Sequence, residues 1–284
     1  MKKRKTFKFK DSQFELGDKT LIMGILNVTP DSFSDGNKYY SIDKAVDRAL
    51  QMLDQGADII DIGGESTRPG ALAVSPADEI NRVIPVVKKL KQSTRKCVLS
   101  VDTTKYEVAE KALEAGADII NDISGLQADP KIAKIVAKYN AGLILMHTKG
   151  TPANMMNLDT YSDLLLEIKT FLNSATKKAQ EYGLSKDNIM LDPGIGFAKN
   201  HLQNIEIIKK ISVIQELNYP LLIGPSRKSF IGQILNKPNP ETRIFGTAAV
   251  VAWLSIHNVD CVRVHDITEM KEVITIIESI RKIE

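Results

Sequence analysis

One short phrase occurs twice in this chain, sixty positions apart. The stretch Gly56-Ala57-Asp58-Ile59-Ile60-Asp61 is matched by Gly116-Ala117-Asp118-Ile119-Ile120-Asn121. Each copy contains a short apolar run that ends on a polar side chain, which is typical of a buried strand leading into a loop. Because one strand phrase is used more than once, we expect a fold built from repeated units.

The rest of the chain alternates between short apolar runs and longer segments with helical spacing. Eight strands are predicted, at residues 21–26, 59–62, 97–101, 119–123, 143–146, 189–191, 221–223 and 262–264. Helices are predicted at residues 42–53 (with Ser41 as N-cap), 77–90 (with a kink at Pro85), 106–114, 130–139, 161–182, 204–217, 229–235, 242–257 and 268–282. A small hairpin is predicted before them, within residues 6–20.

Eight strands with helical returns predict an α/β fold, a single-domain (β/α)8 TIM barrel with a short N-terminal β-hairpin. We assign the hairpin to residues 1–20 and the barrel to residues 21–284. A doubly wound sheet is the alternative, and it usually carries a glycine-rich first loop of the form G-x-G-x-x-G. The first loop here, Asn27-Val28-Thr29-Pro30, lacks that pattern, which favours the barrel.

The composition argues against several classes of protein. The chain has 284 residues and a formal net charge of +3, which gives no reason to expect nucleic-acid or membrane binding. The basic start is not followed by an apolar segment, so no secretory signal is expected, and no run of about 18 apolar residues predicts a transmembrane helix. Cys97 and Cys261 lie in apolar runs and are expected to be reduced thiols of a cytoplasmic protein.

Polar side chains follow every predicted strand. The carboxyl ends of the strands form the active-site face of a barrel, so these side chains should gather there. They are Asn27 and residues 29–36, then residues 65–68, residues 102–104, Asn121 and Asp122, His147, residues 192–197, residues 224–229, and finally Arg263 and His265. A single one could be a solvated strand end, but eight in succession predict a binding site.

One subset suits an aromatic ring rich in nitrogen. Asp102, Asn121, Asp192 and Lys228 would place two carboxylates, an amide and an ammonium at the end of an apolar funnel, where polar groups are costly unless a partner satisfies them. A carboxylate there can accept two parallel N–H groups from the amino-pyrimidinone edge of guanine or a pterin. An internal Asp–Lys ion pair, with the amide as filler, remains the alternative.

A second subset suits an anion, because it combines three arginines, a histidine, hydroxyls and an amide. It consists of Asn27, Thr67, Arg68, Ser226, Arg227, Arg263 and His265. Asn27 together with substrate phosphates is a reasonable magnesium site, since Mg²⁺ takes few protein ligands and keeps several waters. A set of solvated charges is the alternative. His147 is expected to support the structure, and neither zinc-like spacing nor a nucleophile elbow occurs.

Taken together, these stretches resemble the dihydropteroate synthase family of pterin-binding enzymes. The motifs that carry the resemblance are residues 26–36, 61–70, 191–197, 226–229 and 263–266, which occur in the family's order. The resemblance extends from about residue 21 to the C-terminus. It departs at three loop positions, Asn37, Thr148 and Ala198, and none of them removes a proposed ligand group.

The resemblance implies a transferase of folate biosynthesis that joins 4-aminobenzoate to 6-hydroxymethyl-7,8-dihydropterin diphosphate, giving 7,8-dihydropteroate and diphosphate. It implies that the pterin is bound by Asp102, Asn121, Met146, Asp192 and Lys228, and 4-aminobenzoate by Thr67, Pro69, Phe197 and Ser229. It implies that the diphosphate is bound by Asn27, Thr67, Arg68, Arg263 and His265, with Mg²⁺ as the cofactor at Asn27. Catalytic roles would fall to Arg68, Lys228, Arg263 and His265. A homodimer through late helices such as residues 242–257, and competition by sulfonamides, are implied as well.

Other functions stay open at this point. A pterin-binding methyltransferase domain shares the barrel and the Asp/Asn contacts but does not need the anion set, and a non-catalytic paralogue would bind pterin without turning it over. An aldolase-like barrel would need a Schiff-base lysine, for which Lys228 is the best candidate. For the transferase, we expect a dissociative, SN1-like loss of diphosphate, because the pterin ring can stabilise a cationic methylene and a neutral arylamine needs no strong base.

Overall fold

Eight parallel strands form the centre of the structure, a computed structural model that describes residues 5–29, 38–68 and 70–283. The strands are β3 (Leu21–Asn27), β4 (Ile59–Gly63), β5 (Val98–Asp102), β6 (Ile119–Asp122), β7 (Gly142–Met146), β8 (Ile189–Asp192), β9 (Leu222–Ile223) and β10 (Cys261–Val264). They pair in the order β8-β7-β6-β5-β4-β3-β10-β9. The two ends of this sheet meet, because Leu191 in β8 forms a parallel bridge with Leu221 and donates its N–H to Pro220 O at 2.9 Å. The predicted (β/α)8 barrel is confirmed, and a doubly wound sheet with two free edges is excluded.

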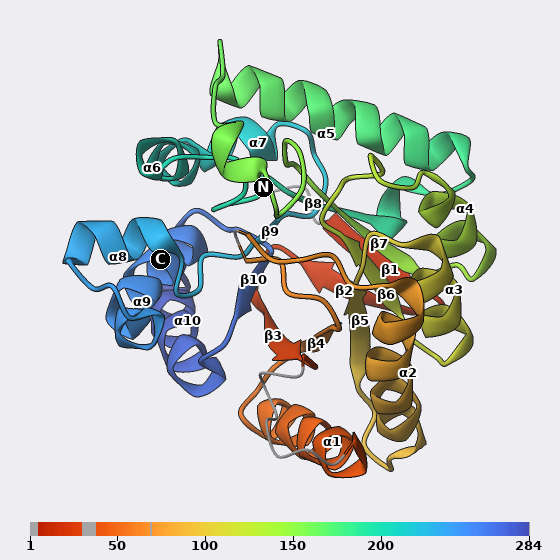
Figure 1. The fold of residues 1–284 in the computed structure, drawn as a ribbon. Helices are drawn as coiled ribbons and strands as arrows, with labels where there is room; N and C mark the ends of the chain where they lie inside the picture. The colour runs from red at the N-terminus through yellow and green to blue at the C-terminus, as the bar shows by residue number, and fades with distance from the viewer. Residues whose placement is uncertain (1–4, 30–37, 69, 284) are drawn as a thin grey trace.

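Helices surround the strands and connect each one to the next (Figure 1). They are α1 (Lys38–Asp54), α2 (Pro76–Gln92), α3 (Tyr106–Glu114), α4 (Lys131–Lys138), α5 (Leu164–Glu181), α6 (His201–Lys209), α7 (Ile211–Gln215), α8 (Ser229–Leu235), α9 (Ile244–Ile256) and α10 (Ile267–Arg281). Short 3₁₀ helices occur at η2 (Met155–Asn157), η3 (Lys186–Asn188) and η4 (Pro240–Arg243). Within the described residues, none of these helices combines the length and the apolar composition needed to cross a membrane.

The side-chain alternation of the strands divides the core into two layers. In β4, Ile60 and Ile62 face outward and pack with Val83 and Val87 of α2 between the barrel and the helices. Ile59 faces inward and packs with apolar side chains from six other strands: Met23, Ile119, Ile144, Met190, Leu222 and Cys261. Asp61 lies two residues beyond Ile59, so it also points into the barrel, above this apolar floor.

The predicted hairpin is present as β1 (Lys5–Phe9) and β2 (Ser12–Leu16), which pair antiparallel. It closes the amino end of the barrel, because Phe7, Phe9 and Leu16 are buried in the inner apolar layer. The fit is close: a Cβ added at Gly142 would come within 2.7 Å of the Phe7 ring. The hairpin therefore completes the barrel core, while the division of the chain at residue 20 stays a prediction.

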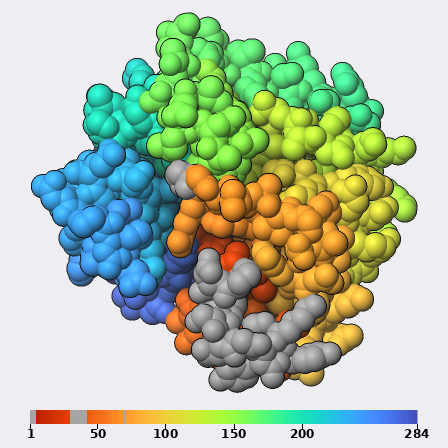
Figure 2. All heavy atoms as spheres, in the orientation of Figure 1, coloured from red at the N-terminus to blue at the C-terminus, as the bar shows by residue number. Residues whose placement is uncertain are grey.

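Two long loops meet at the opposite, carboxyl end. The loop after β4 reaches the loop after β7, where Gly70 N–H donates to Pro152 O at 3.0 Å. In Figure 2 the segment after β4, in orange, lies across the middle of the visible face. Most of the segment between β3 and α1, residues 30–37, lies outside the described residues.

Several boundaries differ from the expected ones. Helix α1 begins at Lys38, so Ser41 lies inside the helix and the prediction that it is the N-cap was wrong. The predicted helix 204–217 consists of α6 and α7, separated at Lys210, and it starts earlier because Asn200 and Gln203 form a capping box. The long helix α5 starts at Leu164, where the Asp163 side chain accepts the N–H of Leu166.

Candidate active site

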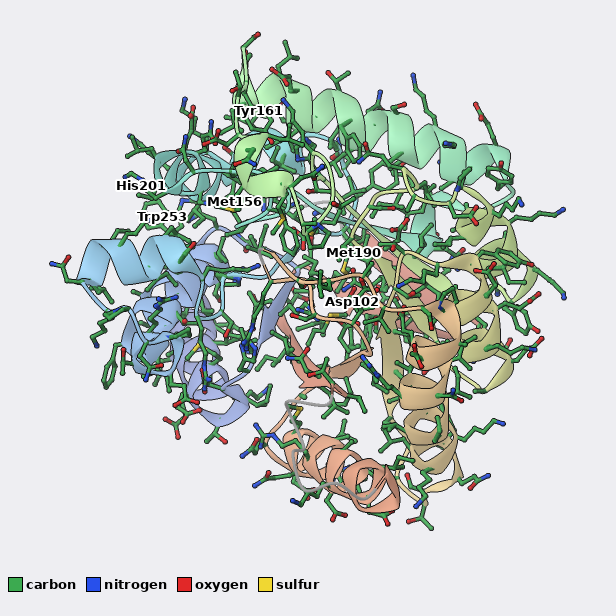
Figure 3. All side chains as sticks on the ribbon, viewed as in Figure 1. Asp102, Met156, Tyr161, Met190, His201 and Trp253 are labelled. Atoms are coloured by element: carbon green, nitrogen blue, oxygen red, sulfur yellow. The ribbon has the colours of Figure 1, made fainter. Side chains whose placement is uncertain are left out.

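A network of buried charges lies inside the carboxyl end of the barrel. Arg263 in β10 donates from Nε to Asp61 Oδ2 at 2.6 Å and from Nη2 to Asp102 Oδ2 at 3.1 Å. The Asn121 amide donates to the same Asp61 oxygen at 3.1 Å. Asp61 is 0% exposed, and its second oxygen, Oδ1, has no hydrogen-bond partner in the described part of the chain. Figure 3 places Asp102 in the middle of the barrel.

Asp61 is the member of this network that the sequence reasoning did not single out. Two signals could have found it. Asp61 occupies the same place in the repeated phrase as Asn121, and the two side chains prove to be hydrogen-bonded. Asp61 is also two residues from Ile59, so both side chains point into the barrel. The alternation along the strand therefore predicts a buried carboxylate that needs a cationic partner.

The second carboxylate that faces the ligand space is Asp192, at the end of β8. It is 6% exposed, and its Oδ1 accepts the N–H of Gly194 at 2.7 Å. Burial raises the pKa of Asp192 to about 6, although the Gly194 N–H and Lys228 act to lower it. Burial also raises the pKa of Asp102 to about 7, against the effect of Arg263 and with a further rise from Asp61. Both carboxylates therefore hold unfavourable buried charge that hydrogen-bond donors of a ligand would relieve.

Lys228 approaches these carboxylates from the loop after β9. Burial and Arg263 lower the pKa of Lys228 to about 8, while Asp192 and Asp102 oppose the shift. Its ammonium lies 4.3 Å from the centre of the Phe197 ring. Across the described residues Lys228 forms no ion pair within 4 Å, so the alternative of a closed Asp–Lys pair does not hold. Lys228 precedes α8 and lies outside the strands. A Schiff-base aldolase would require a lysine within a strand, so Lys228 does not meet that requirement.

The predicted anion set is only partly assembled. His265 Nδ1 lies 2.9 Å from Ser226 Oγ, and the same hydroxyl oxygen accepts the His265 backbone N–H at 3.2 Å. The hydroxyl hydrogen is then free to reach Nδ1, which leaves Nε2–H as a donor toward a ligand. Burial, with Arg263 and Arg227, lowers the pKa of His265 to about 3, so the ring is neutral near pH 7. Arg227 is paired instead with Asp266, at 2.6 and 3.1 Å.

The loop after β4 carries Thr67 and Arg68. The first residues of this loop are held in place by two basic side chains. Lys105 hydrogen-bonds to Glu65 and, at 2.6 Å, to the buried Glu79 of α2. Arg82, also in α2, donates to Gly64 O at 2.8 Å. Thr67 is half-buried and Arg68 is exposed, so the arginine is available to a ligand above the strand ends.

The remaining predicted side chains border the same space. Met146 and Phe197 are buried and pack in one apolar cluster with Met155 and Ala198. Met146 pairs in register with Asp192. Asn27 ends β3 beside Gly63, and Ser229 is the exposed first residue of α8. Pro69 and residues 30–36 of the first motif lie outside the described residues.

The arrangement meets the requirements of a site for a flat, nitrogen-rich ring with an attached anion. Acceptors and donors line the interior, while hydroxyl, imidazole and guanidinium groups lie toward the rim. No cluster of three or more His, Cys, Asp or Glu side chains able to hold a metal occurs among the described residues.

Comparison with known proteins agrees with this chemistry. The pterin binding enzyme family matches residues 23–265, so the chain belongs to the class of pterin-binding barrel enzymes. It is 46% identical over 267 residues to the dihydropteroate synthase of Synechocystis, covering 94% of this chain and 92% of that one. It is 48% identical over 261 residues to the dihydropteroate synthase of Bacillus subtilis, covering 92% and 88%. The chain therefore belongs to the dihydropteroate synthase family and is a transferase of folate biosynthesis.

Solved structures show the same relation. The dihydropteroate synthase of Clostridium difficile, crystallised in the presence of pteroic acid, has a TM-score of 0.89 and 44% identity, with 94% of this chain and 98% of that chain covered. The Xanthomonas albilineans dihydropteroate synthase with 4-aminobenzoic acid has a TM-score of 0.91 and 35% identity, with 99% and 100% covered.

Proposed function

We propose that this chain joins 6-hydroxymethyl-7,8-dihydropterin diphosphate to 4-aminobenzoate and releases 7,8-dihydropteroate and diphosphate. The observation that carries the proposal is the polar set of Asp102, Asn121, Asp192 and Lys228 over an apolar floor, in which the first three are buried and Lys228 is half-buried. The two carboxylates have raised pKa values because no donor fully compensates their burial. The N–H groups of a pterin supply such donors, and Met146 offers an apolar surface for its ring.

The leaving diphosphate would be bound at the rim. Arg68 is exposed on the loop after β4, and the neutral His265 can donate from Nε2. Arg263 is already engaged by Asp61 and Asp102, so its outward N–H groups and its charge would serve the ligand from a fixed position. Thr67 and Asn27 would add a hydroxyl and an amide. Preorganised donors of this kind stabilise charge that develops as the C–O bond breaks.

We propose Mg²⁺ as the cofactor, held by Asn27 together with diphosphate oxygens and waters. The fit rests on the Asn27 amide, whose side chain forms no hydrogen bond with the described residues. Its oxygen Oδ1 lies beside Gly63, 3.7 Å from the place that a Cβ on this glycine would take. One amide oxygen suits a cation that keeps most of its waters. When bound, Mg²⁺ would supply additional charge neutralisation at the leaving group.

We propose that 4-aminobenzoate enters beside Phe197 and Ser229, and that Thr67 and Pro69 contribute to the same subsite. Phe197 presents a fixed apolar ring beneath Lys228. No base is needed for a neutral arylamine, which is consistent with the neutral His265. The expected chemistry is dissociative loss of diphosphate followed by amine attack. A chirally labelled methylene tests this: clean inversion with no scrambling would contradict a free cationic intermediate.

We also propose that two copies of the chain form a homodimer through α8, α9 and the neighbouring α10. Helix α9 is apolar on nearly all sides, which is typical of a helix buried in an assembly. Phe245 of α9 is 79% exposed, and Ile234, Ile256, Ile276 and Ile280 are each more than half exposed. Helices α8 and α9 form one side of the molecule, in blue in Figure 2. A cytoplasmic location is proposed as well, supported by the two free thiols Cys97 and Cys261.

The experiment that tests the proposed function is the formation of 7,8-dihydropteroate from both substrates in the presence of Mg²⁺. The expected result is product and diphosphate in equal amounts. Binding of the pterin diphosphate without any product would instead indicate a non-catalytic pterin-binding protein. Failure to bind the pterin at all would remove the proposal altogether.

A further inference from the structure

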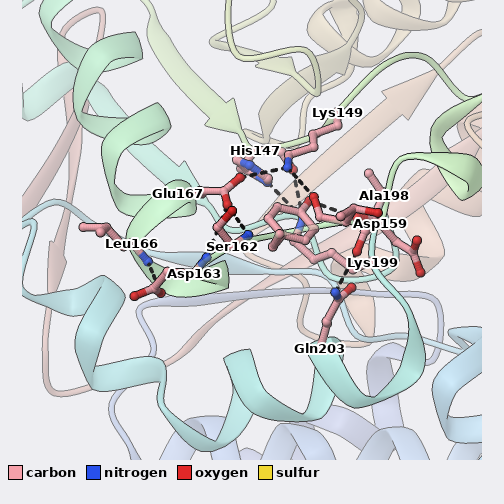
Figure 4. A network of polar contacts seen from close by, with 12 residues as sticks. His147, Lys149, Asp159, Ser162, Asp163, Leu166, Glu167, Ala198, Lys199 and Gln203 are labelled. Atoms are coloured by element: carbon pink, nitrogen blue, oxygen red, sulfur yellow. Dashed lines mark hydrogen bonds and ion pairs between the residues drawn. The ribbon is translucent and has the colours of Figure 1, made fainter.

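A buried lysine lies just outside the set described so far. Lys199, in the loop between β8 and α6, is 2% exposed. In the described part of the chain it has no carboxylate within 4 Å. Its ammonium contacts the carbonyl oxygens of Phe197 at 2.9 Å, Gly194 at 3.1 Å and His147 at 3.4 Å. It also lies 3.0 Å from His147 Nδ1 (Figure 4).

The backbone around Lys199 is folded so that these carbonyls converge. Gly194, Gly196 and Ala198 have φ values of 73°, 79° and 48°, a region that L side chains adopt rarely. A Cβ at Gly194 would lie only 2.0 Å from His147 O. Carbonyl dipoles pointing at one place repel one another unless a cation or several donors lie between them, and the ammonium supplies both.

The same backbone carries two groups that face the substrates. The N–H of Gly194 holds Asp192 Oδ1 at 2.7 Å, while its C=O is bonded to Lys199. The C=O of Phe197 is bonded to Lys199, while its ring lies beneath Lys228. His147 follows Met146 and donates its backbone N–H to Asp192 O at 2.9 Å. The Lys199 ammonium thus connects the end of β7 to the backbone after β8 that positions Asp192 and Phe197.

The His147 ring is suited to accept this hydrogen bond. Burial, together with Lys199 and Lys149, lowers the pKa of His147 to about 2, so the ring stays neutral. It packs edge-on against Phe171, with ring centres 4.9 Å apart. Burial lowers the pKa of Lys199 to about 7, and Asp192 opposes that shift. Burying an ammonium is costly, and the carbonyls and the imidazole around Lys199 are the acceptors that offset this cost.

We propose that Lys199 is a positioning residue for substrate binding: it holds the carbonyls of His147, Gly194 and Phe197 together and thereby fixes the Asp192 carboxylate and the Phe197 ring. The proposal rests on the function proposed above. Lys199 touches neither substrate and acts only through the loop.

Lys199→Met tests this, because it keeps the length and removes the donors and the charge. The matched control is Lys149→Met, a lysine of the same network that binds Glu167 and Thr160 O and none of the three carbonyls. Isothermal calorimetry with 6-hydroxymethyl-7,8-dihydropterin diphosphate and initial rates with 4-aminobenzoate are the readouts. For Lys199→Met the pterin Kd and the KM for 4-aminobenzoate should each rise about tenfold, because small displacements of binding groups weaken contacts strongly. The kcat should fall less than KM rises, and Lys149→Met should match the wild type.

A folded Lys199→Met protein with wild-type Kd and KM and only a lowered Tm would overturn the proposal, since Lys199 would then be purely structural. If Lys199→Met does not fold, Lys199→Gln, which retains an amide donor, is measured against the same criterion. Failure of both variants to fold would also overturn it. Wild-type turnover in the same assay separates the two ideas: inactive wild type removes the proposed function, whereas loss confined to Lys199 variants does not.

Discussion

Replacing Asp61 by Asn tests whether the buried network prepares the pterin site. Asp61 Oδ2 accepts from Arg263 at 2.6 Å and from Asn121 at 3.1 Å. An asparagine has the same shape, and its one oxygen can still accept from both donors, but it loses the negative charge and places an NH2 group where the buried Oδ1 of Asp61 has no partner. Arg263 would retain Asp102 at 3.1 Å. The loss should therefore be smaller than the roughly 3–5 kcal/mol of an abandoned buried charge, about 2 kcal/mol in the free energy of unfolding.

Part of that loss should appear in ligand binding, because Arg263 and Asn121 would be oriented by a neutral amide oxygen, which is a weaker acceptor than the carboxylate. We expect pterin affinity to fall by about 1–2 kcal/mol, or about 5- to 30-fold. Calorimetry with 6-hydroxymethyl-7,8-dihydropterin diphosphate measures the affinity, and urea unfolding measures the stability.

Asp118→Asn is the matched control for this measurement. Asp118 is also buried and bonded to a cation, Lys91, at 2.5 Å, and to the N–H of Leu99 at 2.8 Å. It occupies the other aspartate position of the repeated phrase, at the amino end of β6. Asp118→Asn should lower stability and leave pterin affinity unchanged. A folded Asp61→Asn protein with wild-type affinity would refute the role assigned to Asp61.

Three further predictions concern pH, the leaving group and assembly. Because the pKa values of Asp102 and Asp192 are raised to about 7 and about 6, pterin affinity should increase from about pH 5 to about pH 8 as the carboxylates ionise, and a flat calorimetric profile would contradict this. In the ligand-free protein the two carboxylates lower stability as the pH rises to about 7, whereas His147 and His265, which are neutral in the native state and protonated in the unfolded chain, raise it, so the free energy of unfolding in urea should change little over this range. Arg68→Ala should reduce kcat by about 10²-fold while pterin affinity changes little; the reverse pattern would move Arg68 away from the diphosphate. Phe245→Glu should give monomers in analytical ultracentrifugation, whereas Leu166→Glu, at another exposed apolar position, on α5, should not. Dimers in both variants would rule out the α9 interface.

The barrel was predictable because its signals are local and repeated. Each strand is an apolar run bounded by turn residues, and the alternation with helical segments continues to the C-terminus. Helix starts were less predictable: Ser41 has the chemistry of an N-cap, but α1 continues through it from Lys38. The break at Lys210 between α6 and α7 has no glycine or proline to mark it.

The candidate site was predictable as a set of positions, but the pairings were not. Sequence order does not tell that Arg263 reaches Asp61 across 202 residues, or that Arg227 turns to Asp266. These pairings depend on how the strands close and which side chains share the interior. The burial of Lys199 could not be predicted for the same reason, since a lysine in a glycine-rich loop is normally expected to be exposed.

Whether the pterin is bound at the carboxyl end of the barrel is tested most sharply by the affinity of Asp192→Asn for the pterin diphosphate. The Asp192 carboxylate is buried and aligned by Gly194, and the amide turns one of its acceptors into a donor. The Asp192→Asn protein should still fold and should bind the pterin diphosphate more weakly by about 2–4 kcal/mol. Wild-type affinity in a folded Asp192→Asn protein would contradict it, because the pterin would then be bound elsewhere.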